Sequence, residues 1–230
     1  MYRQLSLFTR RWRNRRTSMN ISIIGAGNVG RALATSALRT GHTVTVSSSN
    51  GDTAAKLAEE TGARAAESNG AAVNGADLVV LAVPYTTIVS VLDEIGPALA
   101  GKIVVDATNP LKPDYSGLAT EGTSGAEEIQ ARVPSARVVK AFNTAFAARQ
   151  TDPQIAGVQV DGYVAADDEE AKAIVLELVK GMGFHPIDAG DLAMARALEA
   201  LAWLNISLQM RHGWSWQAGW KLVGPEGDAS

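Results

Sequence analysis

Short, nearly continuous apolar runs recur along the chain from residue 20 onward. They lie at Ile21–Ile24, Val44–Val46, Leu78–Val83, Ile103–Val105 and Val138–Ala141. Most of their residues are β-branched, and such runs are typical of strands that are covered on both faces of a sheet. Stretches with helical spacing lie between them, at Val29–Leu38, Thr53–Glu60, Thr86–Leu99 and Ala126–Val133. This alternation predicts βαβ units with right-handed crossovers and a parallel sheet.

The same alternation continues in the last third of the chain. It predicts a strand near Tyr163–Ala165, a helix at Glu169–Met182 and a strand near His185–Asp188. A last long helix is predicted from Asp191 to about Arg211. No repeat or low-complexity linker separates this part from the rest, so we expect it to pack tightly on the first part.

A glycine-rich turn joins the first predicted strand, Asn20–Ile24, to the first helix. It reads Gly25-Ala26-Gly27-Asn28-Val29-Gly30. Gly25 permits the tight turn, Gly27 lets the backbone approach a pyrophosphate, and Gly30 allows close packing of the helix on the strand. The alternative is a glycine turn that binds nothing. Because the pattern ends the first strand of a βαβ series, it predicts a doubly wound Rossmann dinucleotide-binding fold, in which the opening helical N–H groups near Asn28 and Val29 face the phosphates.

The end of the second predicted strand bears on the choice of cofactor. An NAD site carries a carboxylate there that bonds the ribose 2′-OH. This chain has instead Ser47, Ser48, Ser49 and Asn50, with no carboxylate before Asp52. Hydroxyls and an amide can donate to a 2′-phosphate without repelling it, so the pattern favours NADP(H), with Lys56 as a cationic candidate. A polar, solvated loop is the alternative for each single serine.

Three regions follow from these elements. We predict a basic extension at residues 1–18, an NADP-binding domain at 19–150 and a small C-terminal α/β–helical lobe at 151–230. The extension lacks the apolar core of a secretory signal, and Met19 stands directly before the first strand. We therefore expect residues 1–18 to be disordered, dispensable for function and derived from an upstream start.

Charge and composition exclude several classes of protein. The extension holds six of the 21 basic residues, so the remainder carries 15 basic against 24 acidic residues, and nucleic acid is not an expected partner. The 230 residues include no cysteine, which excludes disulfides, thiolate metal sites and cysteine nucleophiles. The apolar runs are too short to span a bilayer of about 30 Å. We expect a cytoplasmic protein without membrane contact.

The sequence contains little acid–base machinery. His42, His185 and His212 have no partner at the spacing of a metal site or a catalytic triad, and no G-x-S-x-G pattern occurs. We therefore predict no catalytic side chain and no metal. Such a composition is compatible with hydride transfer between stacked rings, which requires proximity and a dry cleft.

Polar residues end two of the central strands, at the sheet edge where α/β proteins bind ligands. Lys140 and Asn143 are candidate substrate-binding residues, and Lys140 has an equal alternative as the salt-bridge partner of a buried Asp106. Asn109-Pro110 is interpreted as a turn that shapes a nicotinamide site rather than a plain turn.

The last helix leaves further alternatives open. Its apolar positions could form a dimer seam or face the core; they are Leu192, Ala195, Leu198, Ala202 and Ile206. Arg196 and Glu199, three residues apart, are predicted to pair. The three tryptophans that follow could cover an acceptor pocket or bury the tail against the sheet; they are Trp214, Trp216 and Trp220.

An ordered set of motifs resembles one known family. The set comprises Ile24–Gly30, Gly41-His42, Ser48, Ala82-Val83-Pro84-Tyr85, Val105–Leu111, Val139–Thr144, Asp188-Ala189-Gly190 and Ala195–Leu201. It resembles the coenzyme F420-dependent NADP oxidoreductase family over essentially residues 19–230. The resemblance implies a homodimer with a Rossmann domain and a small C-terminal lobe. It also implies hydride transfer between NADP(H) and a small-molecule acceptor, coenzyme F420.

The resemblance also implies roles for particular residues. The backbone of Ala26–Val29 would hold the pyrophosphate, and Ser48 and Ser49 would lie at the 2′-phosphate, where the family carries a Ser-Arg pair. The residues implied around the two ring systems are Val83, Pro84, Tyr85, Asn109, Pro110 and Ala141. Two alternatives to this function are an NADP-dependent reductase of a small metabolite and a non-catalytic sensor of NADPH.

Overall fold

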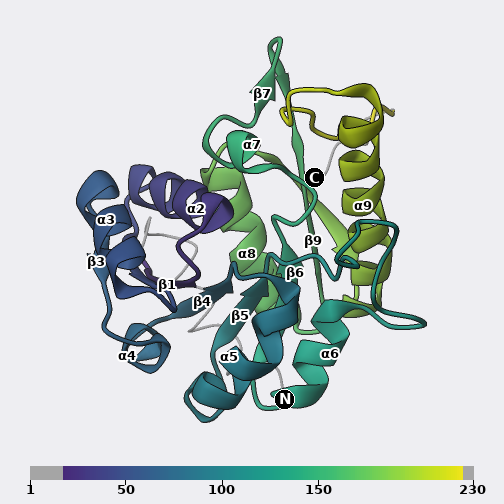
Figure 1. The fold of residues 1–230 in the computed structure, drawn as a ribbon. Coiled ribbons are helices and arrows are strands. Elements are labelled where there is room, and N and C mark those ends of the chain that lie inside the picture. Colours follow the sequence, from purple (N-terminus) through teal and green to yellow (C-terminus); the bar gives the residue numbers. More distant parts are fainter. Residues whose placement is uncertain (1–17, 225–230) are drawn as a thin grey trace, which may run out of the picture.

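Eight strands form one continuous sheet in a computed structural model that describes residues 18–224. Their order is β10-β9-β6-β5-β4-β1-β2-β3 (Figure 1). The strands are β1 (Asn20–Ile24), β2 (Thr43–Ser47), β3 (Arg64–Ala65), β4 (Leu78–Leu81), β5 (Ile103–Asp106), β6 (Arg137–Ala141), β9 (Asp161–Ala166) and β10 (His185–Gly190). Strands β1 to β6 pair in parallel, with β1 between β2 and β4. The predicted doubly wound α/β fold is confirmed.

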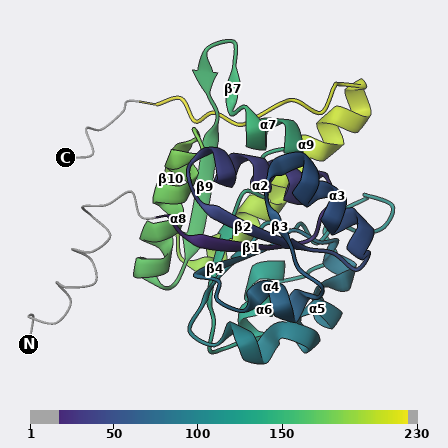
Figure 2. The same ribbon diagram turned by 90° about the vertical axis from the view of Figure 1, so that its left-hand side faces the viewer.

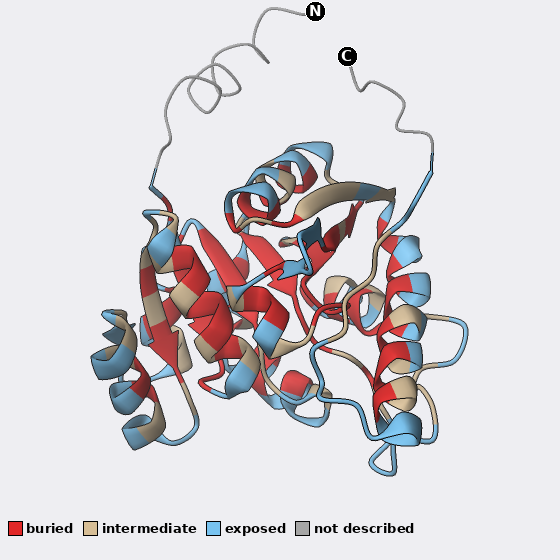
Figure 3. Ribbon diagram, turned by 90° about the horizontal axis from the view of Figure 1, so that it is seen from above, coloured by how far each residue is buried: buried red, intermediate tan, exposed pale blue. Residues whose placement is uncertain are grey.

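Helices cover both faces of this sheet. One face carries α2 (Asn28–Arg39), α3 (Gly51–Thr61) and α8 (Glu169–Gly181), and the other carries α4 (Asn69–Val73), α5 (Ile88–Ile95) and α6 (Gly125–Arg132). Ile23 and Val80 belong to the first hydrophobic cluster, whereas Leu81 and Val104 belong to the second. Figure 3 shows the strands as the buried layer and the outer helix faces as exposed. Burial on both faces explains why the strands read as continuous apolar runs.

Several element boundaries differ from those predicted. The run Leu78–Val83 is a strand only to Leu81, because the chain then turns toward Pro84. The predicted helix Thr86–Leu99 is α5 flanked by 3₁₀ turns at Tyr85–Thr87 and Gly96–Leu99, the second with a proline at its start. The sequence reading missed β3, α4, α7 (Ala147–Thr151) and the hairpin β7 (Gln154–Ile155)–β8 (Val158–Gln159). All of these are five residues long or shorter, and such segments carry little periodicity.

One strand direction contradicts the sequence prediction. β9 pairs with β6 antiparallel, although β10 then pairs with β9 in parallel. A parallel connection requires a crossover of a dozen or more residues that spans the sheet. The segment between β6 and β9 contains only α7 and the β7–β8 hairpin, so the chain does not cross to the other end of the sheet. β9 therefore starts at the end where β6 finishes and runs antiparallel to it. The C-terminal region extends the same sheet through β9 and β10.

The segment after α9 (Ala195–His212) is tied back to the far edge of the sheet. Figure 2 shows this segment, in yellow, crossing the molecule from α9 toward β7. The fully buried Asp161 carboxylate accepts hydrogen bonds from Lys221 Nζ at 2.9 Å and from the Leu222 N–H at 2.5 Å, and His185 Nδ1 lies 2.8 Å away. Burial by itself would raise the pKa of Asp161, but these contacts outweigh it and lower the pKa from its ordinary value.

Two expectations concern the outer parts of the chain. The basic extension predicted to be disordered spans residues 1–18, of which residues 1–17 lie outside the described residues. Within residues 18–224, no helix combines the length and the apolar character needed to cross a bilayer.

We predict that Asp161→Asn releases the C-terminal segment at neutral pH. The substitution removes charge-assisted bonds worth about 2 kcal/mol, so Lys221 should become a faster site of trypsin cleavage. Because the folded pKa is lowered, the contribution of Asp161 is present above the ordinary pKa of 3.8 and disappears as pH falls through the lower folded value. Melting temperatures of the two proteins should therefore converge in strong acid. Asp152→Asn, at an exposed carboxylate, is the control, and equal cleavage rates would contradict the prediction.

Candidate functional site

Two adjoining cavities lie at the carboxyl ends of the central strands. The smaller one, about 430 Å³, is bordered by Gly27–Val29 after β1, Ala82–Thr86 after β4 and Ala107–Asn109 after β5. The larger one, about 790 Å³, is bordered by Phe142–Ala148 after β6, by α9 and by Ser215–Gln217. Five residues line both cavities: Asn28, Val29, Ala107, Asn109 and Tyr115. Ligands of open α/β sheets bind at this edge.

The glycine turn has the geometry that its sequence predicts. Gly25 has φ +116°, and a Cβ there would lie 2.3 Å from the Ala82 carbonyl oxygen. A Cβ on Gly30 would lie 1.8 Å from the Gly25 carbonyl oxygen, so both positions require glycine for the backbone itself. A Cβ on Gly27 would meet nothing within 4 Å. Gly27 is therefore the one glycine of the three that borders open space.

The start of α2 fits a pyrophosphate. Gly27 is its N-cap residue, no side chain caps the helix, and its first turn contains no acid. The first N–H groups of a helix need a partner, and the helix dipole favours an anion there. These groups open onto the smaller cavity through Gly27, Asn28 and Val29. The residues present thus fit the phosphates of a dinucleotide.

The loop after β2 lies outside both cavities, beside the glycine turn. Ser47 donates to Asn69 Oδ1 at 2.8 Å, and the Gly25 N–H donates to the Ser47 carbonyl at 2.9 Å. Asn50 caps α3, because its side chain accepts from the Asp52 N–H at 3.0 Å. Ser49 is exposed. Ser48, Ser49 and Asn50 remain predicted contacts of the ribose phosphate.

Asn109 and Asn143 link the two cavities. Asn109 Nδ2 donates to the Asn143 carbonyl at 3.1 Å, while Asn143 Nδ2 donates to Asn109 Oδ1 at 2.9 Å and to the Leu198 carbonyl at 3.0 Å. The Thr108 hydroxyl and Asn143 Oδ1 are buried without a partner among residues 18–224. Thr108 lines the smaller cavity and Asn143 the larger one. Both atoms are closed off from solvent, so they belong to the packed wall behind the cavities rather than to its open surface.

The other predicted residues differ in their positions. Val83, Pro84 and Tyr85 line the smaller cavity, where the Tyr85 hydroxyl donates to Glu128. Burial, and then the contact with Glu128, raises the pKa of Tyr85, so its phenol is neutral. Pro110 and Ala141 are buried and line neither cavity.

The larger cavity contains two strained residues. Phe142 has φ +65° and Trp216 has φ +59°, a region that bulky side chains rarely adopt. The Phe142 carbonyl accepts from the buried Gln150 Nε2 at 2.8 Å, and the Trp216 N–H donates to Gln209 Oε1 at 3.0 Å. Strain of this kind costs about 1–3 kcal/mol each and persists where the surroundings hold it, most often at ligand sites.

Sequence reasoning missed several residues of this cavity. They are Phe146, Asn205, Met210, Ser215 and Gln217. One signal for them was present, because Asn205 and Gln209 are polar residues on the apolar side of α9 and are 4% and 1% exposed. The left-handed backbone of Phe142 has no sequence signal, since only tertiary contacts maintain it.

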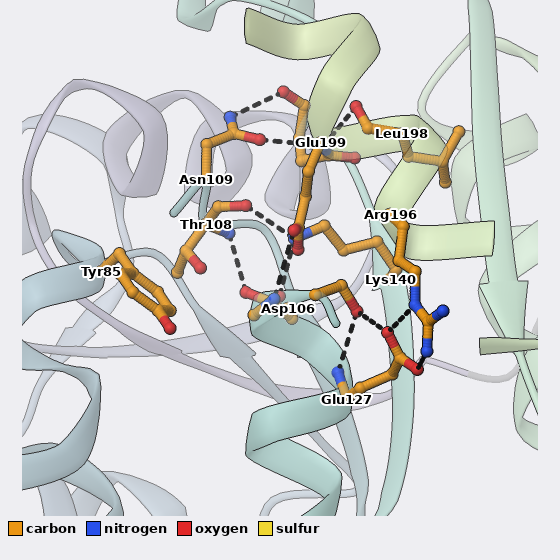
Figure 4. A network of polar contacts seen from close by, with 12 residues as sticks. Tyr85, Asp106, Thr108, Asn109, Glu127, Lys140, Arg196, Leu198 and Glu199 are labelled. Atoms are coloured by element: carbon orange, nitrogen blue, oxygen red, sulfur yellow. Dashed lines mark hydrogen bonds and ion pairs between the residues drawn. The ribbon is translucent and has the colours of Figure 1, made fainter. Parts of the chain in front are cut away.

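Lys140 is the centre of a fully buried ionic cluster (Figure 4). Its Nζ donates to Asp106 Oδ2 at 2.7 Å, to the Thr108 carbonyl at 2.7 Å and to Glu199 Oε1 at 2.8 Å. All three ammonium protons are therefore used inside the protein. The structure supports the salt-bridge alternative for Lys140, and the role as a binder of substrate anions is wrong for this arrangement. Burial is the main reason why the pKa of Glu199 is raised, and Lys140 only partly opposes it.

The predicted pair between Arg196 and Glu199 is wrong. Glu199 points into the core toward Lys140, whereas Arg196 forms two bonds with Glu127, at 2.8 Å and 2.5 Å (Figure 4). The apolar stripe of the last helix faces the core, because all five of its residues are buried within the single chain. That face is therefore not a dimer seam.

The tryptophans and histidines have separate roles. Trp216 lines the larger cavity and packs edge-on against Phe146, with ring centroids 5.4 Å apart. Trp220 follows the sheet edge, where its carbonyl accepts from the Asp161 N–H. Trp214 is half exposed and stacks on His212. His42 accepts from the Met19 N–H.

The fold and this site define a dinucleotide-binding protein of the Rossmann type. Residues 20–110 match the family model described as "NADP oxidoreductase coenzyme F420-dependent". The F420-dependent NADP reductase of Methanocaldococcus jannaschii is 34% identical over 153 residues, which cover 64% of this chain and 67% of that protein. A crystal structure from Arthrobacter sp. FB24, provisionally assigned as an F420-dependent NADP reductase, is 32% identical with a TM-score of 0.78 and covers 85% of this chain and 96% of its own. The chain belongs to the coenzyme F420-dependent NADP oxidoreductase family.

Other relatives differ in length and in chemistry. Metalloreductase STEAP3 of Rattus norvegicus is 35% identical over 185 residues, which cover 79% of this chain. This chain spans only 36% of that relative. A reductive aminase of Aspergillus terreus, solved with NADPH and a keto ester, is 25% identical with a TM-score of 0.65 and covers 86% of this chain and 64% of its own. The family and this NADPH complex support NADP(H) as the cofactor.

The glycine turn yields a first prediction for the site. Gly30→Ala should destabilise the fold by about 1–3 kcal/mol or more, because its Cβ collides with backbone. Gly27→Ala should leave the melting temperature within about 2 °C and weaken NADPH binding, because its Cβ occupies only open space. Thermal melts and NADPH titrations measure both effects. Full NADPH affinity in Gly27→Ala would contradict the assignment of the turn.

The ionic cluster yields a second prediction. Lys140→Met leaves two carboxylates buried without their cation and should cost about 3–5 kcal/mol of unfolding free energy. Glu199→Gln keeps an acceptor for Lys140 and leaves a one-to-one pair with Asp106. The pKa of Glu199 is raised in the folded protein, so its buried negative charge lowers the free energy of unfolding. This destabilisation is absent below the ordinary pKa of 4.5 and grows as pH rises through the folded pKa. At neutral pH the Gln variant should therefore match or exceed the wild type in stability, and a loss as large as that of Lys140→Met would refute this explanation.

Proposed function

We propose that the protein passes a hydride directly between NADP(H) and a planar acceptor, a deazaflavin such as coenzyme F420 or a flavin-like ring. The observation that carries this proposal is the wall that the two cavities share at Val29, Ala107 and Asn109. Bound NADP(H) would supply the hydride, through its nicotinamide. The chain supplies two adjoining sites and keeps both rings at the same sheet edge.

The lining of the shared wall supports direct transfer. Of its five residues only Tyr115 is ionisable, and its side chain is 51% exposed. The Asn109–Asn143 pair holds the wall in place by reciprocal hydrogen bonds. The loop that follows Asn109 is tied to α9 by Trp203 Nε1, which donates to the Tyr115 carbonyl at 3.2 Å. Transfer between two stacked rings depends mainly on such positioning and on the exclusion of water.

Two relatives named F420-dependent NADP reductases favour a deazaflavin as the acceptor. The homodimer implied by the resemblance belongs to this proposal as well. A second candidate function is an NADP-dependent reductase of a small carbonyl or imine compound. The larger cavity favours it because no charged side chain lines it among the described residues, and because the reductive aminase relative acts in this class.

An absorbance assay tests the proposal. The full chain should oxidise NADPH faster than NADH in the presence of F420 or FMN, and only slowly without an acceptor. Turnover with small ketones and amines but not with F420 or FMN would favour the second candidate function. A preference for NADH would contradict the cofactor assignment itself.

The loop after β2 should determine the preference for NADPH. Ser49→Arg adds a cation at the expected phosphate position and should raise NADPH affinity about tenfold, since a charge-assisted bond contributes about 1.5–3 kcal/mol. Ser49→Asp places a like charge there and should weaken NADPH while sparing NADH. Titrations of both cofactors with both variants measure this shift. Unchanged NADPH affinity in Ser49→Asp would place the phosphate elsewhere.

A further inference from the structure

Asn205 presents a free hydrogen-bond donor to the larger cavity. It lies on α9, is 4% exposed and lines the cavity next to Ala202 and Ile206. Its Oδ1 accepts a hydrogen bond from Gln209 Nε2 at 3.2 Å, so the amide oxygen faces Gln209 on the same helix. Its Nδ2 has no partner among residues 18–224 and is not sealed off from the cavity. An amide donor this deeply buried normally has a partner, and here the Nδ2 is available to a group bound in the cavity.

A relay holds this amide in its orientation. Gln209 is 1% exposed, and its Oε1 accepts from the N–H of Trp216 at 3.0 Å. Gln209 can therefore offer only its Nε2 to Asn205. The same main-chain bond holds Trp216 at φ +59°, with its ring edge-on against Phe146 at the cavity wall. One glutamine thus orients both the polar donor and the aromatic wall.

Asn143, the other buried amide that lines the larger cavity, has no such free donor. Both protons of Asn143 Nδ2 are used, one by Asn109 Oδ1 and one by the Leu198 carbonyl. Asn109 Nδ2 donates to the Asn143 carbonyl at the shared wall. The lining of the larger cavity among the described residues contains no Lys, Arg, His, Asp or Glu. The site therefore offers a neutral donor and aromatic surface, and it offers no counter-charge to an anion.

We propose that Asn205 is the specificity-determining residue for the hydride acceptor. Its Nδ2 donates to a carbonyl oxygen or ring nitrogen of an uncharged planar ring that lies against Trp216. This inference rests on the proposed function, because it takes the larger cavity as the acceptor site. Any charged tail of the acceptor must then lie outside this cavity, since burying it without a counter-charge is costly.

Binding of riboflavin, an uncharged ring with several carbonyl and ring-nitrogen acceptors, tests the proposal on the full chain. Quenching of riboflavin fluorescence is titrated in the presence of saturating NADP⁺. Asn205→Leu and Asn205→Asp should each weaken riboflavin about three- to tenfold or more, because both lack the donor. NADPH affinity should stay unchanged. Gln209→Met should cause a smaller loss, since the donor remains but its orientation is released.

Ser207→Ala is the matched control, because that hydroxyl donates to the Trp203 carbonyl within the same helix and lines neither cavity. Equal riboflavin affinity in the wild type and Asn205→Leu would overturn the proposal, as would the absence of riboflavin binding by the wild type. FMN binding more than tenfold more tightly than riboflavin would overturn the uncharged-ring part. The proposed function and this inference are distinguished by combining the two assays. If F420 supports NADPH oxidation while the Asn205 variants keep wild-type riboflavin affinity, only this inference is wrong.

Discussion

The Lys140 ammonium is the contact on which the site depends. It lies fully buried between Asp106 at the end of β5, Glu199 on α9 and the Thr108 carbonyl. Glu199 in turn accepts from the Gly125 N–H at the start of α6. One cation therefore joins two central strands and two helices. A buried cation without its partners is very costly, so these elements must assemble together.

The position of the cluster explains the shape of the two cavities. Thr108 and Asn109 follow Asp106 after Ala107, and Lys140 holds the Thr108 carbonyl at the shared wall. Glu199 and Leu198 place the start of α9 against the same wall, where Leu198 accepts from Asn143. Further along α9, Asn205 and Gln209 reach the larger cavity, and the Asp161 contacts return the chain across the sheet edge. The charged side chains of the Lys140 cluster and Asp161 thus lie in the surrounding packing, and the described residues that line the larger cavity are uncharged.

This separation relates the protein to its relatives. The glycine turn and most of the lining of the smaller cavity belong to the region matched by the family model, residues 20–110, whereas the larger cavity is built mostly from residues beyond it. Relatives as different as an F420-dependent NADP reductase, a metalloreductase and a reductive aminase resemble the chain. Such a range of relatives is compatible with one fold, because fold alone does not determine function.

The sequence by itself determined the alternation of strands and helices, the glycine turn and the absence of a ribose-binding carboxylate after β2. These features are local: β-branched runs between helical patterns, and three glycines of which Gly25 and Gly30 have no room for a Cβ. Tertiary structure decided the rest. The direction of β9 depended on a connection that contains only a short helix and a hairpin and does not cross the sheet, and the partners of Lys140, Glu199 and Arg196 come from distant elements. The larger cavity depends on Phe142 and Trp216 in backbone conformations that no local preference favours, since they persist only where long-range contacts hold them.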